Sequence, residues 1–163
     1  MPKIYRLSRA QVVPADLESV WEFFATPKNL NRLTPPEMHF AILSGTDEPM
    51  YEGQLVEYRI RLIPGLIVHW LAEIIYIEPK RRFIDEQRFG PYAFWYHEHR
   101  FTPTPEGTRI EDHVTYALPF GPIGELAHAL WVRRQLEYIF DFRRRAIEAI
   151  FARYPSARDT EMR

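Results

Sequence analysis

His97 and His99, two histidines separated by one residue, are the side chains best placed to do chemistry in this sequence. Residues two apart on a β-strand point to the same face, so both imidazoles should face the same way. The turn before this segment should bring Asp85 near His97, and the loop after it should place Asp112 opposite His99. A carboxylate orients an imidazole and raises its pKa, so these four residues are candidates for general acid–base chemistry.

The same residue types are also metal ligands. His-x-His on a strand, together with Asp85 or Asp112, could ligate a divalent cation. A third histidine on this face is missing, because His113 should point outward and His69 has the wrong parity. We therefore predict no metal site and no other cofactor.

A structural interpretation accounts for the same four residues. Burying an unpaired carboxylate or imidazole costs on the order of several kcal/mol, so these groups should pair with each other or line a wet cavity. Such pairs would fix the strand register and give a cavity one polar end. This interpretation fits ligand binding, and we adopt it over catalysis.

The elements that must position these residues are strands, because five segments alternate in character at period two. Turn signals separate them, among them Pro64-Gly65 and Gly90-Pro91. Short turns fix the pairing of an antiparallel ladder, so one set of residues from each segment should share one face of the sheet. The five sets are Gln54, Val56, Tyr58, Ile60 and Leu62; Trp70, Ala72, Ile74 and Tyr76; Phe83, Asp85, Gln87 and Phe89; Trp95, His97, His99 and Phe101; and Ile110, Asp112, Val114, Tyr116 and Leu118.

Helical signals lie on both sides of these strands. An opening strand over about residues 4–13 precedes a helix that Asp16 should cap, and a second short helix follows at about 28–33. A run from about 123 to 153 predicts one long helix with a wide apolar arc. A long helix laid over a curved antiparallel sheet tends to enclose a cavity, which favours a small apolar ligand.

The apolar arc of the long helix consists of two stripes. The first holds Val132, Leu136, Ile139, Ile147 and Ile150, and the second holds Trp131, Tyr138 and Phe142. We expect both stripes to be core; the alternative is a partner surface that seals a homodimer or serves a regulatory partner. Arg143 falls on the apolar stripe and should reach a carboxylate. The remaining histidines, expected at surface or boundary positions, are His39, His69, His113 and His128.

Composition limits the class of protein. The 163 residues predict a single domain, 1–153, followed by a polar tail, 154–163. A formal net charge of -1 gives no field that would attract nucleic acid or an anionic membrane. The absence of cysteine excludes disulfides and thiolate sites. No signal-peptide pattern and no stretch of about 20 apolar residues occurs, so we expect a cytoplasmic protein without membrane insertion.

Three groups of motifs resemble a known superfamily. They are Val20-Trp21-x-Phe23-Phe24 with Pro27-x-Asn29-Leu30-x-x-Leu33-Thr34-Pro35; Phe83-x-Asp85-x-Gln87 with Gly90-Pro91-Tyr92 and Trp95-x-His97-x-His99-x-Phe101; and Gly107-Thr108 with Asp112-x-Val114-x-Tyr116-x-Leu118-Pro119. Over about residues 3–152 the chain resembles the START/Bet v 1-like superfamily, in its SRPBCC (polyketide cyclase/dehydrase and lipid transport-like) branch.

This resemblance implies an α+β helix-grip fold. In that fold a curved antiparallel sheet, with two short helices after its first strand, wraps around a long C-terminal helix. The superfamily includes lipid carriers, coenzyme-Q-binding proteins, aromatic polyketide cyclases and chaperone-ATPase activators. The resemblance therefore predicts the fold and leaves the activity open.

We predict a small-molecule binding protein that holds a hydrophobic or aromatic ligand between the sheet and the C-terminal helix. The expected ligand-binding residues are Tyr58, Trp70, Phe83, Asp85, Gln87, Trp95, His97, His99, Asp112, Tyr116, Leu136 and Phe140. The alternative is a cyclase/dehydratase-type enzyme that acts on a polyketide-like substrate. Its candidate catalytic residues are His97, His99, Asp85 and Asp112.

Overall fold

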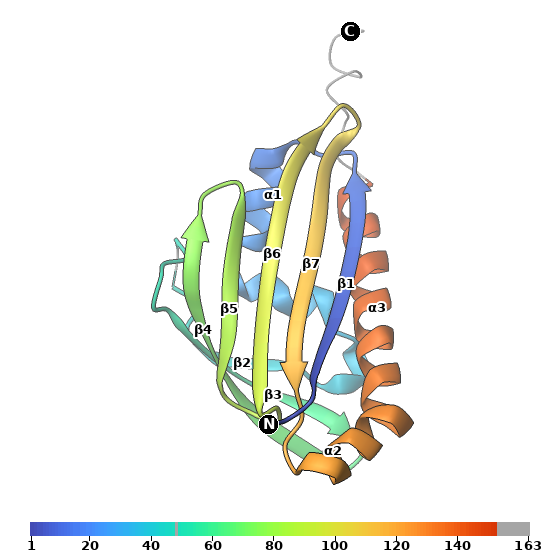
Figure 1. The fold of residues 1–163 in the computed structure, drawn as a ribbon. Helices are drawn as coiled ribbons and strands as arrows, with labels where there is room; N and C mark the ends of the chain where they lie inside the picture. The colour runs from blue at the N-terminus through green and yellow to red at the C-terminus, as the bar shows by residue number, and fades with distance from the viewer. Residues whose placement is uncertain (48, 153–163) are drawn as a thin grey trace, which may run out of the picture.

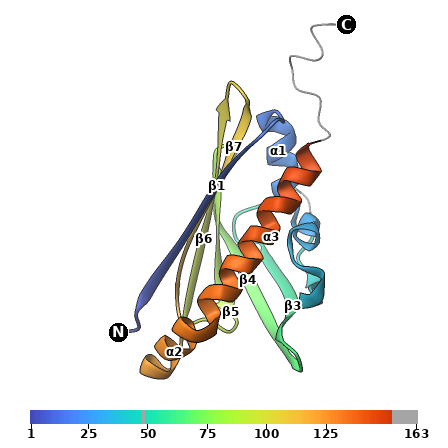
Figure 2. The same cartoon turned by 90° about the vertical axis from the view of Figure 1, so that its right-hand side faces the viewer.

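The computed structural model describes residues 1–47 and 49–152 and shows the helix-grip architecture (Figure 1). Within these residues, antiparallel strands form one sheet in the order β1-β7-β6-β5-β4-β3-β2. The long C-terminal helix runs diagonally across one face of the sheet (Figure 2). The predicted α+β helix-grip fold is confirmed. The predicted tail, 154–163, lies outside the described residues.

The bounds of the elements follow the chain. The strands are β1 (Ile4–Val13), β2 (Ala41–Ser44), β3 (Leu55–Ile63), β4 (Leu66–Glu78), β5 (Arg82–Phe89), β6 (Phe94–Thr104) and β7 (Gly107–Ala117). The helical segments are α1 (Leu17–Phe24), the 3₁₀ segments η1 (Pro27–Leu33) and η2 (Pro36–Met38), α2 (Gly121–Ala127), the π turn η3 (His128–Val132) and α3 (Arg133–Phe151).

Helix α1 begins where the sequence predicts. The Asp16 carboxylate accepts a hydrogen bond from the backbone N–H of Ser19 at 2.9 Å, so one of the unpaired amides of the first turn is satisfied. The apolar face of α1 then buries Val20, Phe23 and Phe24. These contacts fix α1 over one end of the sheet.

The strand register agrees with the prediction around the histidines and departs from it in the β4–β5 ladder. His99 pairs with Asp112, and Asp85 pairs with His97. The inward-facing set is wrong for Tyr76 and Phe89, which are 36% and 76% exposed. The β4–β5 ladder contains two bulges, and a bulge changes which side of the sheet the following residues face.

The predicted single helix is a succession of α2, the π turn η3 and α3. Its buried residues in α3 are Leu136, Phe140, Arg143, Ile147 and Phe151. The expectation that the second apolar stripe is core is wrong, because Trp131 and Tyr138 are 39% and 44% exposed and Phe142 is half-buried. A helix that packs on a sheet buries only the face it turns toward the sheet. In the described part of the chain, no helix is long and apolar enough to cross a lipid bilayer.

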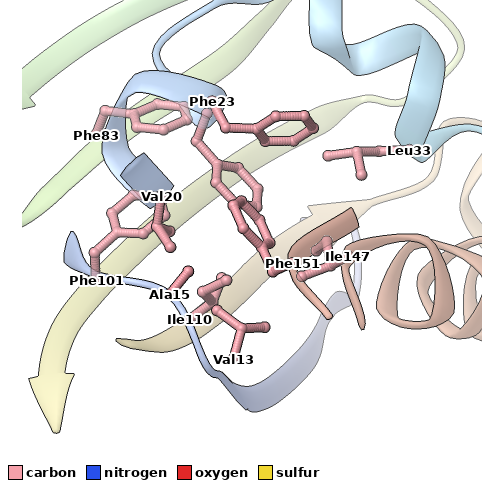
Figure 3. Close-up of a cluster of buried hydrophobic side chains, with 11 residues drawn as sticks. Val13, Ala15, Val20, Phe23, Leu33, Phe83, Phe101, Ile110, Ile147 and Phe151 are labelled. Atoms are coloured by element: carbon pink, nitrogen blue, oxygen red, sulfur yellow. The ribbon is translucent and has the colours of Figure 1, made fainter. Parts of the chain in front are cut away.

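A cluster of buried apolar side chains joins α1, the C-terminal end of α3 and the sheet (Figure 3). The rings of Phe23 and Phe151 meet edge to face, with centroids 5.4 Å apart. Three members of the cluster, Phe23, Phe24 and Phe83, also line a cavity beside it. The cluster therefore bounds that cavity at one end.

Candidate ligand-binding site

A cavity of about 200 Å³ lies between the sheet, η1 and α3. Alternating side chains of β3 to β6 form its floor, since inward-facing residues recur at period two. The predicted binding residues that line it are Tyr58, Trp70, Phe83, Asp85, Trp95, His97, His99, Leu136 and Phe140. The register of the sheet and the helix together bring this predicted set around one space.

Three predicted binding residues lie elsewhere. The Gln87 side chain donates to the carbonyl of Tyr92 at 2.8 Å and accepts from its N–H at 3.1 Å, so Gln87 closes the β5–β6 turn. The Tyr116 hydroxyl is hydrogen-bonded to His128 Nε2 at 2.8 Å. Asp112 is buried behind the two histidines and does not reach the cavity surface.

The expectation of a surface or boundary position is wrong for His128. Its side chain is buried, and its ring stacks on Tyr5 with centroids 3.5 Å apart. The π turn η3 begins at His128 and places the imidazole between Tyr5 and the Tyr116 hydroxyl. Nothing in the residue pattern signals this turn.

Sequence reasoning missed other lining residues on the helices and loops. They include Leu30, Leu33, Met38, Phe40, Tyr92, Ile139 and Arg143. Leu30 and Leu33 sit three apart in η1, and Ile139 belongs to the first apolar stripe, so a signal for these three existed. Tyr92 follows the Gly90-Pro91 turn, where alternation stops, and no periodicity places it.

Aromatic rings form one wall of the cavity. Tyr58 stacks on Trp70 with centroids 5.6 Å apart, and Trp70 meets Trp95 edge to face at 5.2 Å. Tyr92 packs against Trp95 at 4.8 Å. Burial raises the pKa of Tyr58 and the pKa of Tyr92, so both hydroxyls are neutral and the wall carries no charge.

The opposite, polar end of the cavity contains two histidines whose hydrogen bonds cross the strand register. His97 Nε2 is bonded to Asp112 Oδ1 at 2.8 Å, and His99 Nε2 is bonded to Asp85 Oδ2 at 2.7 Å. Each histidine thus pairs with the carboxylate diagonal to it, although Asp85 is opposite His97 in the ladder. The two imidazole rings lie 3.7 Å apart, centroid to centroid.

Arg143 of α3 completes this cluster, as the prediction that it reaches a carboxylate requires. Its Nε donates to Asp112 Oδ2 and its Nη2 to Asp112 Oδ1, both at 3.1 Å. The same Nη2 lies 3.4 Å from His99 Nδ1. The guanidinium also lies 5.3 Å from the ring centroid of Phe24. A two-pronged bond of this kind fixes both the carboxylate and the helix.

Burial opposes charge on every titratable member of the cluster, and hydrogen bonds decide the outcome. At Asp112, burial is outweighed by Arg143 and the two histidines, which hold its pKa well below the usual range. At Asp85, burial is outweighed chiefly by the bond from His99, so its pKa is also lowered. Burial, together with the charge of His99, lowers the pKa of His97. Burial acts likewise on His99, but bonds to Asp112 and Asp85 prevail and raise its pKa.

Solved structures of other proteins share this architecture. CV1439 from Chromobacterium violaceum matches with a TM-score of 0.65 and 19% identity over 92% of this chain and 98% of its own. The ginseng major latex-like protein 151 from Panax ginseng matches at 0.63 and 13%, over 91% and 97%. A START superfamily protein from Mycobacterium smegmatis matches at 0.65 and 13%, over 90% and 97%.

These similarities show that the chain has the START/Bet v 1-like fold. No protein-family model matches the sequence, and no curated protein is significantly similar to it.

Proposed function

We propose that the chain binds one small hydrophobic or aromatic molecule in the cavity between the sheet and α3. The observation that carries the proposal is an aromatic-walled cavity with one cluster of convergent polar groups, which is the usual composition of a small-molecule site. The START/Bet v 1-like fold, which commonly holds hydrophobic ligands, supports it. Location in the cytoplasm stays a prediction.

The volume of the cavity limits the size of the ligand. An engineered apolar cavity of about 150 Å³ in another protein binds benzene. The present volume of about 200 Å³ therefore suits one substituted ring or two fused rings. A diacyl lipid exceeds this volume.

The polar end favours a ligand that carries a hydroxyl or carbonyl group. Asp85 is the most exposed of the three polar residues there, at 18% of its side chain against 9% for His97 and 8% for His99. A ligand hydroxyl that reaches this end meets the Asp85 carboxylate first. Hydrogen bonds to charged groups contribute about 1.5–3 kcal/mol, so this contact would orient the ring.

Calorimetric titration of the purified chain with 2-naphthol, a two-ring phenol, tests the proposal. Ala72 is buried and lines the cavity, so Ala72→Phe fills part of the space. Ala149 is exposed on α3, so Ala149→Phe is the matched control. We expect the wild type and the control to bind alike and Ala72→Phe to bind at least about tenfold more weakly, a loss of about 1.4 kcal/mol. Absence of binding to the wild type, or equal affinity of a folded Ala72→Phe variant, would contradict the proposal.

Acid–base catalysis on a polyketide-like substrate is the second candidate. It is favoured by the opposite directions of the pKa shifts of His97 and His99, because such pairs supply an acid and a base. If it holds, His99→Ala abolishes turnover of an aromatic polyketide-like substrate while ligand affinity survives. Equal loss of turnover and affinity would indicate a structural role.

A further inference from the structure

One ligand atom from each of Asp85, His97 and His99 converges on a single point at the polar end of the cavity. These three atoms all lie within 4.8 Å of one another. His97 Nδ1 is 3.8 Å from Asp85 Oδ2, and His99 Nε2 is 2.7 Å from the same oxygen. Ligand atoms about 2.1 Å from a tetrahedral ion lie about 3.4 Å apart, so the two separations bracket the required value.

From this convergence we propose that Asp85, His97 and His99 bind a divalent transition-metal ion. The proposal goes beyond ligand binding and does not depend on it. The sequence argument against a metal rested on a missing third histidine. In the folded chain Asp85 supplies the third ligand.

Asp112 provides independent support, because it organises the other nitrogen of each histidine. Its Oδ1 accepts the N–H of His97 Nε2 at 2.8 Å and lies 3.4 Å from His99 Nδ1. Since the Asp112 carboxylate is an acceptor, the proton of neutral His97 is on Nε2 and the lone pair is on Nδ1. Metal-binding histidines usually hold a carboxylate in this way with their non-coordinating nitrogen.

His99 changes partner when the ion binds. In the metal-free protein its Nε2 is hydrogen-bonded to Asp85 Oδ2. The ion takes the place of the proton between these two atoms, and the remaining ring proton sits on Nδ1, which faces Asp112 Oδ1. Arg143 keeps Asp112 in position throughout, through its two bonds at 3.1 Å.

The charge balance and the donor atoms define the class of metal. Two carboxylates and one guanidinium leave a formal charge of -1 around neutral imidazoles, which a divalent cation offsets. Two imidazoles and a carboxylate suit zinc, iron(II), cobalt(II) or nickel(II) better than magnesium or calcium. Because all three ligands line the cavity, the open coordination positions would face it.

Metal titration of the full chain after chelator treatment tests this proposal. Zn²⁺ binding is measured by calorimetry, and Co²⁺ binding by its visible absorption. We expect one ion per chain, together with the visible bands of cobalt in a low-symmetry nitrogen/oxygen site. Binding of no ion would overturn the proposal.

Variants locate the ion. Asp85→Asn keeps a hydrogen-bond acceptor for His99 but loses the charge, and it should weaken Zn²⁺ binding about 100-fold or more, at least as much as loss of a second-shell partner. His69 is 68% exposed, so His69→Ala is the control and should bind as the wild type does. Equal affinity in Asp85→Asn and the control would place the ion elsewhere and refute the site.

His97→Gln adds a second variant and should also weaken binding, with circular dichroism confirming that both variants fold. If neither folds, thermal unfolding of the wild type decides the matter: Zn²⁺ must raise its Tm, and no rise refutes the site. Titration of the same samples with 2-naphthol reports on apolar binding separately, so failure of the metal site and failure of the cavity are distinguishable.

Discussion

Replacement of Arg143 by methionine tests whether the buried cluster holds the helix to the sheet. Methionine keeps the apolar stem beside Phe24 and removes both hydrogen bonds to Asp112. Arg143 is only 6% exposed and Asp112 only 5%, so solvent screens the pair little. Removal of one partner from a buried ion pair costs about 3–5 kcal/mol, because the other charge is left uncompensated. Two lost charge-assisted hydrogen bonds of about 1.5–3 kcal/mol each give a similar figure.

Urea unfolding at pH 7 measures this loss, and thermal unfolding should show a Tm lower by about 6–20 °C for a chain of this size. Arg144→Met is the matched control, since Arg144 is exposed on the same helix and forms only a surface pair with Glu148. The control should change stability by less than about 0.5 kcal/mol. Adding Asp112→Asn to Arg143→Met should recover part of the loss, because no buried charge then remains unpaired. A loss below about 1 kcal/mol in Arg143→Met would refute the reasoning.

Three further predictions concern other parts of the fold. Asp16→Ala should cost about 1 kcal/mol at pH 7; because the N–H of Ser19 lowers the pKa of Asp16, this contribution is present above the unfolded-state pKa and should vanish as urea unfolding is repeated at pH values falling through the folded-state pKa. Phe151→Ala should cost about 3–5 kcal/mol in urea unfolding, because Phe151 is fully buried, whereas Phe89→Ala at a 76% exposed position should cost less than about 0.5 kcal/mol; equal losses would contradict the core assignment. The homodimer stays a prediction: Leu130 is 65% exposed on the helix, so Leu130→Glu should abolish concentration-dependent association in sedimentation velocity, and a wild type that is monomeric at every concentration would exclude the dimer.

Strand parity and turn positions were sufficient to predict the polar end of the cavity. The alternation around His97 and His99 and the turns on either side predicted the Cα pairing with Asp85 and Asp112. They could not predict that the hydrogen bonds cross the ladder. Register fixes which backbones are opposite, whereas side chains also lean along the strand and reach diagonal neighbours. The contact between Arg143 and this cluster was predictable because a charged residue on a buried stripe needs a partner.

Other features left no readable signal. The bulges that turn Tyr76 and Phe89 to solvent arise from the twist of the whole sheet and from local backbone geometry, and an alternating pattern continues through them unchanged. The π turn that buries His128 is likewise invisible to helical periodicity. The residues of η1 reach the cavity through tertiary packing, which spacing alone does not specify.

A crystal structure of the chain with 2-naphthol tests the central claim most directly. The account predicts ring density between Trp70, Trp95 and α3, with the hydroxyl within hydrogen-bonding distance of Asp85. Density for the probe only on the exposed apolar side of the helix, around Leu126 and Leu130, or a cavity filled by side chains, would contradict it.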